Sequence, residues 1–331
     1  MNFHQSQDGD MLQMTRPWPV NLNPGDENLF GHERLKSVQW PGWAGICLLV
    51  YDPYHLYGWP THYMQKKHGL ILGTFNWKDI SRWRVTLSFN EVLLADHWSA
   101  NYFHWFTECY PKIWWLIQYG GISKIKLPVW LYDIPFIRAS LETFPQLQVI
   151  TVKRAVIKIS IFPRWCKLNM ITGNYNPQLL QQVFQHFRCK ANDTGTLKRY
   201  CIYRSAVKGR GIINFNEVEQ ILQQFQIEAV DFEKISWNEQ VAMMQSTSFL
   251  MGVHGAGLTN MLFMPKGSII WEWRLQSDTH NNCYFSLAAA MEHKYYYQLC
   301  KGDATHLQTQ QNNFWVDTNV LKNELSQIFE I

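Results

Sequence analysis

The sequence predicts a mixed α/β protein made of two successive units of similar size with a cleft between them. Short apolar runs alternate with longer segments of helical spacing, which favours parallel sheets layered with helices. The 331 residues supply material for two cores, since single domains commonly hold about 100–200 residues. The segment 248–264 passes from an apolar run through a glycine-spaced turn into a short helical pattern. This strand–turn–helix order is typical of α/β proteins.

In the first half, residues 1–40 are rich in Pro, Asn, Asp and Gly, and we expect an irregular arm along the surface. The pattern predicts helices over 99–119 and 134–144. Short apolar runs predict strands at 46–51, 69–72, 91–95, 128–132 and 147–152. We place the first unit at residues 1–172.

In the second half, Pro177 opens a helix, and Ser236 with Glu239 forms a capping box that begins another. The predicted helices are 177–187, 216–225, 236–244, 258–264, 282–292 and 317–329. The predicted strands are 199–204, 227–232, 248–252, 268–273 and 295–300. The second unit spans 173–331, and we expect its last helix to pack back on the first unit.

Composition narrows the class of partner. Hydrophobic residues make up 47% of the chain and charged residues 17%, which indicates a packed globular protein. The net charge of +4 suits a small anionic ligand, and no Lys/Arg run or zinc pattern favours nucleic acid. Aromatic content of 15%, with 16 Trp, favours a carbohydrate partner, although aromatic side chains also fill cores.

The chain's expected location follows from its cysteines and its hydrophobic runs. Seven cysteines without a CxxC pair predict reduced thiols and a cytoplasmic location, with peripheral association at the inner membrane face as an alternative. The first residues lack the basic and apolar regions of a signal peptide. The early apolar run 46–51 is far shorter than the roughly 20 residues of a membrane span.

The turn His254-Gly-Ala-Gly257 predicts an anion site, because it can aim several N–H groups and a helix N-terminus at one point. Glycine there permits positive φ and close backbone approach. His254 can donate to a phosphate or leaving-group oxygen; the alternative is a structural turn with a satisfied histidine. A lipase oxyanion loop needs Gly-x-Ser-x-Gly and a Walker loop needs Gly-Lys-Ser/Thr, and the sequence has neither.

Two further features accompany this turn. Arg204, Lys208 and Arg210 follow a predicted strand, and guanidinium groups bind phosphate oxygens bidentately. A solvated surface loop is the alternative. Glu272 lies near the end of the next strand, where a carboxylate can bind the two hydroxyls of a ribose. An exposed edge glutamate is the alternative.

In the first half, His104 and Glu108 are four residues apart, so they share one helix face with Asn101. An imidazole and a carboxylate in register make a plausible general base pair, and a buried structural pair is equally consistent with the spacing. Pro111 is expected to kink or end the first helical portion, since it removes the bond to the carbonyl of Thr107.

Taken in order, these motifs resemble the family 61 glycosyltransferases, over roughly residues 97–300. The run His254-Gly-Ala-Gly-Leu-Thr-Asn260 is the most specific part, and residues 1–90 match nothing in that family. The resemblance implies a GT-B fold, with two Rossmann-like domains facing across a cleft. It implies the acceptor on the N-terminal domain and the nucleotide-sugar on the C-terminal one. The nucleotide-sugar residues so implied are Arg204, Lys208, Arg210, His254, Gly255, Ala256, Gly257, Leu258, Thr259, Asn260 and Glu272.

The resemblance further implies an inverting, metal-independent transferase acting on a glycan or glycoconjugate, in polysaccharide biosynthesis. The donor would be a nucleoside-diphosphate sugar, a UDP-sugar first, with no other cofactor. The only Asp-x-Asp, at 8–10, lies in the expected arm. Glu108, oriented by His104, is the predicted base, and Asp96 and His97 are next in line. The rival interpretation is an inactive glycan-binding or scaffold subunit of a polysaccharide-assembly complex.

Overall fold

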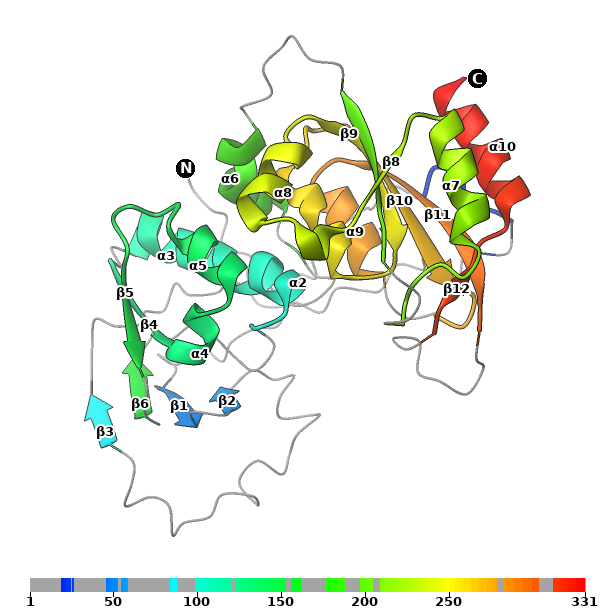
Figure 1. Cartoon of the computed structure of the whole chain (residues 1–331). Coiled ribbons are helices and arrows are strands. Elements are labelled where there is room, and N and C mark those ends of the chain that lie inside the picture. Colours follow the sequence, from blue (N-terminus) through cyan, green and yellow to red (C-terminus); the bar gives the residue numbers. More distant parts are fainter. Residues whose placement is uncertain are drawn as a thin grey trace. The chain divides into compact units, whose positions relative to one another are not determined.

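The computed structural model of the chain is shown in Figure 1. It describes residues 19–24, 26, 46–52, 55–58, 84–87, 99–120, 123–152, 156–161, 175, 177–188, 197–204, 209–278, 282–303 and 312–330. The chain divides into two compact units. The first comprises Met1–Gln13 with Arg34–Ile171, and the second comprises Met14–Glu33 with Thr172–Ile331.

The second unit is built on a six-stranded sheet in the order β12-β11-β10-β9-β7-β8. Its strands are β7 (Lys198–Ile202), β8 (Glu228–Val230), β9 (Thr247–Val253), β10 (Ile269–Leu275), β11 (Lys294–Gly302) and β12 (Phe314–Trp315). Each neighbouring pair is parallel except β11 with β12. The predicted parallel sheet is confirmed for this half, and β12 is a short strand that the sequence analysis did not predict.

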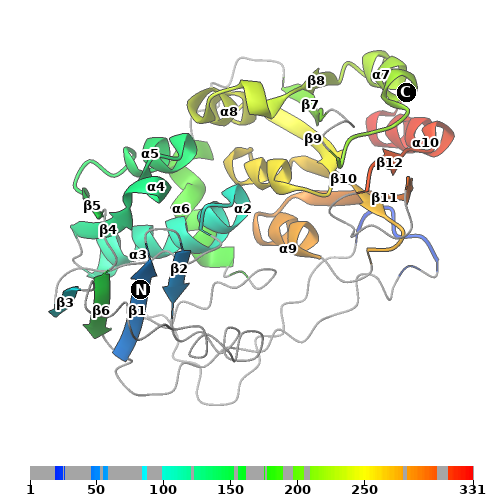
Figure 2. The same cartoon turned by 60° about the horizontal axis from the view of Figure 1, so that its bottom comes forward.

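Helices cover both faces of this sheet, as Figures 1 and 2 show from two directions. On one side lie α7 (Phe215–Gln224) and α10 (Thr318–Phe329). On the other lie α6 (Pro177–Arg188), α8 (Trp237–Met244), α9 (Cys283–Ala290) and the 3₁₀ helix η7 (Ala256–Phe263). A further short 3₁₀ turn, η6 (Phe232–Lys234), precedes α8. The short helix predicted at 258–264 is present as η7, and it is a 3₁₀ helix because its bonds span three residues, as from Leu258 N to Gly255 O at 3.0 Å.

The predicted capping box is confirmed at the start of α8. The Ser236 hydroxyl accepts from the Glu239 N–H, and the Glu239 carboxylate accepts from the Ser236 N–H at 2.9 Å. These bonds satisfy N–H groups that have no partner within the helix.

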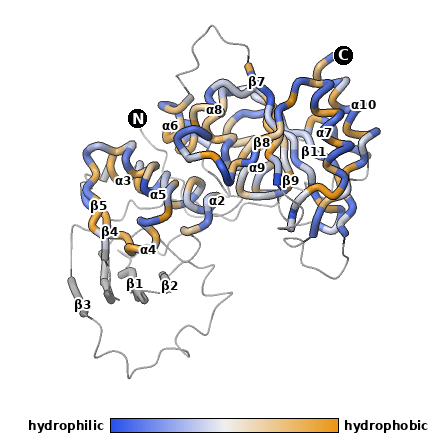
Figure 3. Tube along the Cα trace, in the orientation of Figure 1, coloured by the Kyte–Doolittle hydropathy of each residue, from blue (hydrophilic) through white to orange (hydrophobic). Residues whose placement is uncertain are grey.

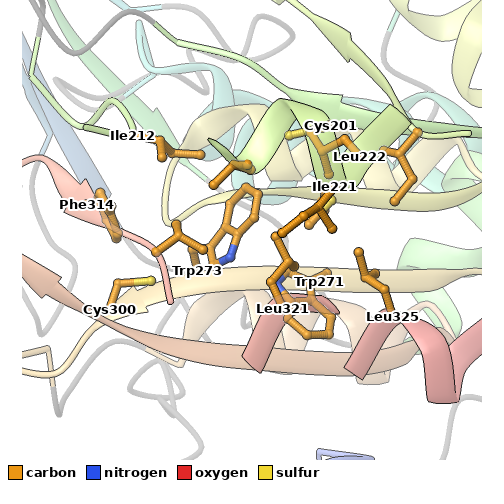
Figure 4. Packing of buried hydrophobic residues seen from close by; sticks show 14 of the residues in the cluster. Cys201, Ile212, Ile221, Leu222, Trp271, Trp273, Cys300, Phe314, Leu321 and Leu325 are labelled. Carbon is orange, nitrogen blue, oxygen red and sulfur yellow. The ribbon is translucent and has the colours of Figure 1, made fainter. Parts of the chain in front are cut away.

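The core between the sheet and α7/α10 follows from the alternation of side chains along the strands. Trp271 and Trp273 of β10 are fully buried and face this core, together with Leu321 and Leu325 of α10. Figure 4 shows the two indoles among the aliphatic side chains of the neighbouring elements. Hydrophobic and hydrophilic residues alternate along α7 and α10 in Figure 3, as expected of helices with one buried face. The last helix, expected on the first unit, thus supplies both leucines to the core of its own unit.

Part of the N-terminal arm pairs with β11. The Val20 N–H donates to the Tyr295 carbonyl at 2.9 Å. The Asn21 side chain bonds the Tyr297 carbonyl at 2.8 Å and the Tyr297 N–H at 3.1 Å. The arm therefore satisfies backbone groups on β11, consistent with the expected irregular surface segment.

The first unit contains two sheets. One has the order β2-β1-β6-β3, built from β1 (Ile46–Asp52), β2 (His55–Gly58), β3 (Arg84–Leu87) and β6 (Val156–Ile161). The other pairs β4 (Lys124–Pro128) with β5 (Gln148–Val152) in parallel.

The prediction of parallel strands in this half is wrong for β1, which runs antiparallel to β2 and β6. Only residues 53–54 separate β1 from β2, whereas a parallel pair needs a crossover of about a dozen residues. The strand predicted at 128–132 is also wrong: β4 ends at Pro128, and α4 (Val129–Tyr132) follows. A short apolar run does not by itself distinguish strand from helix. The predicted strands at 69–72 and 91–95 lie outside the described residues.

The predicted helix at 99–119 is present in three parts: α2 (Tyr102–His104), the π-helical segment η4 (Trp105–Cys109) and α3 (Tyr110–Gly120). The chain stays helical through Pro111, but the helix type changes just before it, where the Tyr110 N–H donates to the Trp105 carbonyl five residues back. The predicted helix at 134–144 is α5 (Pro135–Leu141). The chain is a mixed α/β protein, and its GT-B arrangement of two Rossmann-like domains stays a prediction.

Candidate functional site

Strand order in the second unit marks one position at the edge of the sheet. From β7 the chain goes outward to β8, then returns past β7 to β9 and continues to β10 and β11. The order therefore reverses between β7 and β9, which are parallel neighbours with Cys201 opposite Met251. Ligands of open α/β sheets bind outside the carboxyl ends of the strands at such a switch point. The loops that leave these ends carry Arg204 and His254.

The glycines of the turn after β9 allow it to approach β7 closely. A Cβ on Gly257 would lie 3.1 Å from Cδ1 of Ile202, and one on Gly252 would lie 3.2 Å from Cβ of Ile202. Gly255 is extended, with φ 173° and ψ 165°. The predicted close approach is confirmed, and none of these glycines uses the left-handed backbone that glycine permits.

Three of the predicted ligands, Leu258, Thr259 and Asn260, have buried side chains. The Asn260 amide donates to the Gly257 carbonyl at 3.1 Å and to Oε1 of Gln240 at 3.2 Å. Gln240 in turn donates to the carbonyls of Phe232 and Ile235, both at 2.9 Å. The Asn260 amide therefore holds the turn in shape, and Gly255, Ala256 and Gly257 are the partly exposed part of it.

The basic loop after β7 brings Arg210 to the turn and holds Arg204 near it. Nη1 of Arg210 lies 3.5 Å from the His254 carbonyl oxygen, and Nη2 of Arg204 lies 3.7 Å from Oε1 of Glu233. Burial lowers the pKa of Arg210, and the positive charge of Arg204 lowers it further. An anion that binds between two such guanidinium groups offsets the repulsion between their charges, so the pair favours anion binding. Lys208, the third predicted member, lies outside the described residues.

Arg210 has a left-handed backbone, with φ 57°, and a distant segment holds it there. The next residue, Gly211, donates its N–H to Oδ1 of Asn313 at 3.0 Å and accepts from the Phe314 N–H at 2.8 Å. The Asn313 side-chain amide is itself bonded to Asp303 at 2.7 Å. Asn313 was not among the predicted site residues, because it lies 102 residues from Gly211 and no local pattern marks it.

Glu272 is buried at the centre of the sheet, on the face opposite Trp271 and Trp273. Its side chain is 1% exposed, so the alternative of an exposed edge glutamate is wrong. Nδ1 of His254 bonds Oε1, and the Tyr295 hydroxyl donates to Oε2 at 2.5 Å. Both carboxylate oxygens accept bonds from within the protein, and the expected contact with ribose hydroxyls stays a prediction.

The charge of this carboxylate is balanced by its surroundings. Burial acts to raise the pKa of Glu272, but His254, Arg274 and Tyr295 together hold it below its usual range. Arg274 is fully buried, and it donates to Oδ1 of Asn282 at 2.8 Å and to the Asp278 carbonyl at 3.1 Å. Tyr295, Arg274 and Asn282 are thus partners of the site that the sequence analysis did not identify.

The predicted pair of His104 and Glu108, the candidate general base of the first unit, is formed. Nδ1 of His104 lies 2.9 Å from Oε1 of Glu108, and the two side chains are 20% and 12% exposed. The pair spans the π-helical segment, a feature frequent at functional sites. Asn101, expected on the same face, is the N-cap of α2, where its Oδ1 accepts from the Phe103 N–H at 2.9 Å. Asp96 and His97 lie outside the described residues.

The described part of the chain has neither a metal-binding cluster nor a membrane-spanning helix. No group of three His, Cys, Asp or Glu side chains there could hold a metal ion. No described helix has the length and apolar character to cross a membrane. Cys109, Cys201, Cys283 and Cys300 are buried and belong to no disulfide.

The fold and the site define an α/β protein with a glycine-spaced turn and a basic loop at the switch point of a parallel sheet. The family model Glycosyltransferase 61 matches residues 102–271, which is half of the chain. The chain belongs to this family, so the resemblance that its motifs suggested is confirmed.

The relatives include EGF domain-specific O-linked N-acetylglucosamine transferases. The protein of Drosophila melanogaster is 33% identical over 191 residues, or 50% of this chain and 36% of its own length. That of Bos taurus is 29% identical over 197 residues, 55% of this chain and 36% of its own. That of Rattus norvegicus is 25% identical over 245 residues, 69% of this chain and 43% of its own. The chain therefore spans less than half the length of these relatives.

Proposed function

We propose that this chain is an inverting glycosyltransferase that uses a nucleoside-diphosphate sugar, with UDP as the first candidate nucleotide. The observation that carries the proposal is the contact of Arg210 with the glycine turn at the switch point of the sheet, with Arg204 near enough for its charge to act on Arg210. Guanidinium groups and turn N–H groups suit a diphosphate, and they can neutralise it as it leaves. The GT-B arrangement belongs to the same proposal.

The proposed reaction is a single in-line displacement. The oxygen of an acceptor hydroxyl forms a bond to the anomeric carbon while the bond from that carbon to the diphosphate oxygen breaks. The electron pair of the broken bond leaves with the nucleoside diphosphate, and the Glu108 carboxylate takes the proton of the acceptor hydroxyl. His104 orients that carboxylate through their 2.9 Å contact.

For the acceptor, we propose a hydroxyl of a glycan or glycoconjugate, as in polysaccharide biosynthesis. The names of the relatives favour a second candidate, a hydroxyl on an EGF domain, with N-acetylglucosamine as the sugar. Incubating the chain with UDP-N-acetylglucosamine and either a folded EGF domain or oligosaccharides separates these two acceptors. The cytoplasmic location expected from the cysteines stays a prediction.

The donor site is tested by thermal stability in the presence of UDP. A ligand at 100 times its Kd stabilises the folded state by about 2.7 kcal/mol. The double variant Arg204→Ala/Arg210→Ala should lose most of that stabilisation, because a hydrogen bond to a charged group contributes about 1.5–3 kcal/mol. The matched control is Arg138→Ala in the first unit, where the guanidinium pairs with Asp133 at an exposed site. Undiminished stabilisation in the double variant contradicts the proposed donor site.

The rival function, an inactive glycan-binding or scaffold subunit, predicts binding without turnover. A transferase should hydrolyse its nucleotide-sugar slowly when no acceptor is present, and a scaffold should not. Release of UDP from a panel of UDP-sugars, measured with the wild type and with Glu108→Gln, separates the two. UDP binding with no release from any donor, with or without acceptor, supports the scaffold.

A further inference from the structure

The carboxylate of Glu272 is placed to act on His254 rather than on a ligand. Its side chain is 1% exposed, compared with 15% for His254, so the imidazole lies between it and solvent. Its two oxygens accept from the His254 ring and from the Tyr295 hydroxyl. A ribose hydroxyl that bound Glu272 would have to enter a space already filled by these side chains.

The His254 ring is held in one orientation. Its backbone N–H donates to the Trp273 carbonyl at 2.9 Å, which fixes the start of the turn against β10. Its ring packs edge-on against Tyr284 with centroids 5.0 Å apart. Since Nδ1 bonds the carboxylate, Nε2 is the polar ring atom through which His254 can meet a ligand at the turn.

The groups behind Glu272 keep it negatively charged. Burial alone would raise its pKa, but His254, Arg274 and the Tyr295 hydroxyl more than offset this, and the carboxyl stays ionised. An ionised carboxylate on Nδ1 accepts the Nδ1–H of the ring, which fixes its orientation, and Nε2 carries an N–H as well when the ring is an imidazolium. The same arrangement orients the imidazole in hydrolase triads.

We propose that Glu272 is a positioning residue, which holds His254 so that the imidazolium form of its ring donates the Nε2–H to the leaving diphosphate, with Tyr295 supporting Glu272 from behind. The nucleotide's ribose is then bound by other residues. This inference rests on the proposed donor site, because it assigns the diphosphate of that site as the partner of His254. A fixed donor aimed at developing negative charge stabilises the transition state without reorganisation.

Two probes separate this role from ribose binding. Inorganic pyrophosphate contains the anion that His254 would bind but has no ribose, whereas UDP contains both. If Glu272 positions His254, Glu272→Gln should raise the Kd of both ligands by a similar factor, about 10-fold or more, as expected for the loss of a charge-assisted bond. If Glu272 binds the ribose, Glu272→Gln should weaken UDP and leave pyrophosphate unchanged. The measurement is the Kd of each ligand by calorimetry.

A double-mutant cycle tests whether Glu272 acts through His254. His254→Ala should also weaken pyrophosphate, and adding Glu272→Gln to His254→Ala should change its Kd by less than about twofold. Additive effects overturn the proposal. The matched control is Glu239→Gln, which alters an exposed glutamate of the same unit and should leave both Kd values at the wild-type level.

Two further variants keep the test decisive. Because a buried charge is removed, Glu272→Gln is compared with Tyr295→Phe, which keeps the ring and should weaken pyrophosphate by a smaller factor, about threefold. An unchanged Kd in Tyr295→Phe together with a misfolded Glu272→Gln overturns the proposal. Arg204→Ala/Arg210→Ala identifies the source of a failure. If this double variant weakens both ligands but Glu272→Gln does not, only the role of Glu272 is wrong. If the wild type binds neither ligand, the donor site and this inference are both wrong.

Discussion

Gly257 packs closely against Ile202: a Cβ added to the glycine would lie 3.1 Å from Cδ1 and 3.2 Å from Cγ2 of the isoleucine. This contact sets how closely the turn after β9 lies to β7. Gly255, two residues earlier, has room: its nearest neighbours would be the Val253 carbonyl at 3.6 Å and Nη1 of Arg210 at 3.7 Å. The two glycines therefore have different reasons to lack a side chain.

Gly257→Ala should destabilise the second unit by about 1–3 kcal/mol, because the extra methyl forces a shift in a packed site. Urea unfolding of the wild type and variant measures this. Gly255→Ala should unfold near the wild-type midpoint but bind UDP more weakly, since its methyl would lie beside the Arg210 guanidinium. Adding Ile202→Val, which removes Cδ1, should recover part of the stability lost in Gly257→Ala. No recovery would mean that the strain lies elsewhere.

Glu108→Gln should reduce kcat by about 10²–10⁴-fold, because it removes the proposed base and keeps the shape of the side chain. Donor affinity should stay within about twofold, since the donor contacts lie in the second unit. If the pair with His104 is only structural, the result differs: the melting temperature falls and the activity per folded molecule is retained. Both quantities are measured on one preparation, with His104→Gln as the companion variant.

EDTA should leave turnover and UDP affinity within about threefold, a difference below about 1 kcal/mol. The physical reason is that Arg204 and Arg210 supply positive charge at the proposed diphosphate site. The assay compares enzyme dialysed against EDTA with enzyme given Mn²⁺ or Mg²⁺. Activity that vanishes in EDTA and returns with Mn²⁺ contradicts this assignment and directs attention to acidic residues outside the described part of the chain.

Stability should depend on pH through Glu272. Its pKa in the folded protein lies below the value of about 4.3 for an unfolded glutamate. Its contribution to stability is therefore complete above about pH 4.3 and is lost as the pH falls through the lower folded pKa. At pH 7, Glu272→Gln should cost about 3–5 kcal/mol, because it leaves buried positive charge without its partner.

Urea unfolding at several pH values between 3 and 7 tests this. The free energy of unfolding of the wild type should approach that of Glu272→Gln as the pH falls. Glu239→Gln serves as the comparison for an exposed carboxylate whose pKa is lowered by its bonds to Ser236. A wild-type advantage over Glu272→Gln that stays constant at all pH values would show that the carboxylate's charge is not what stabilises the site.

Much of the second unit could be read from local pattern. The strand ending at residue 253, the turn at His254 and the capping box at Ser236 each depend on neighbours within a few residues, and each is present. Local patterns were less reliable in the first unit. The antiparallel pairing of β1 with β6 joins residues more than a hundred positions apart, and no periodicity encodes such a partner.

The residues of the candidate site also divide into those that local sequence identifies and those that only the fold brings together. The sequence by itself determined which residue types are present at the turn and in the basic loop, because those motifs are contiguous. Only the tertiary structure decided that Glu272 is buried with both oxygens occupied, that Tyr295 and Arg274 stand behind it, and that Asn313 holds the loop of Arg210. The physical reason is that these contacts arise from strand order and register. Parallel pairing of β10 and β11 brings Glu272 and Tyr295, 23 residues apart in sequence, into hydrogen-bond contact.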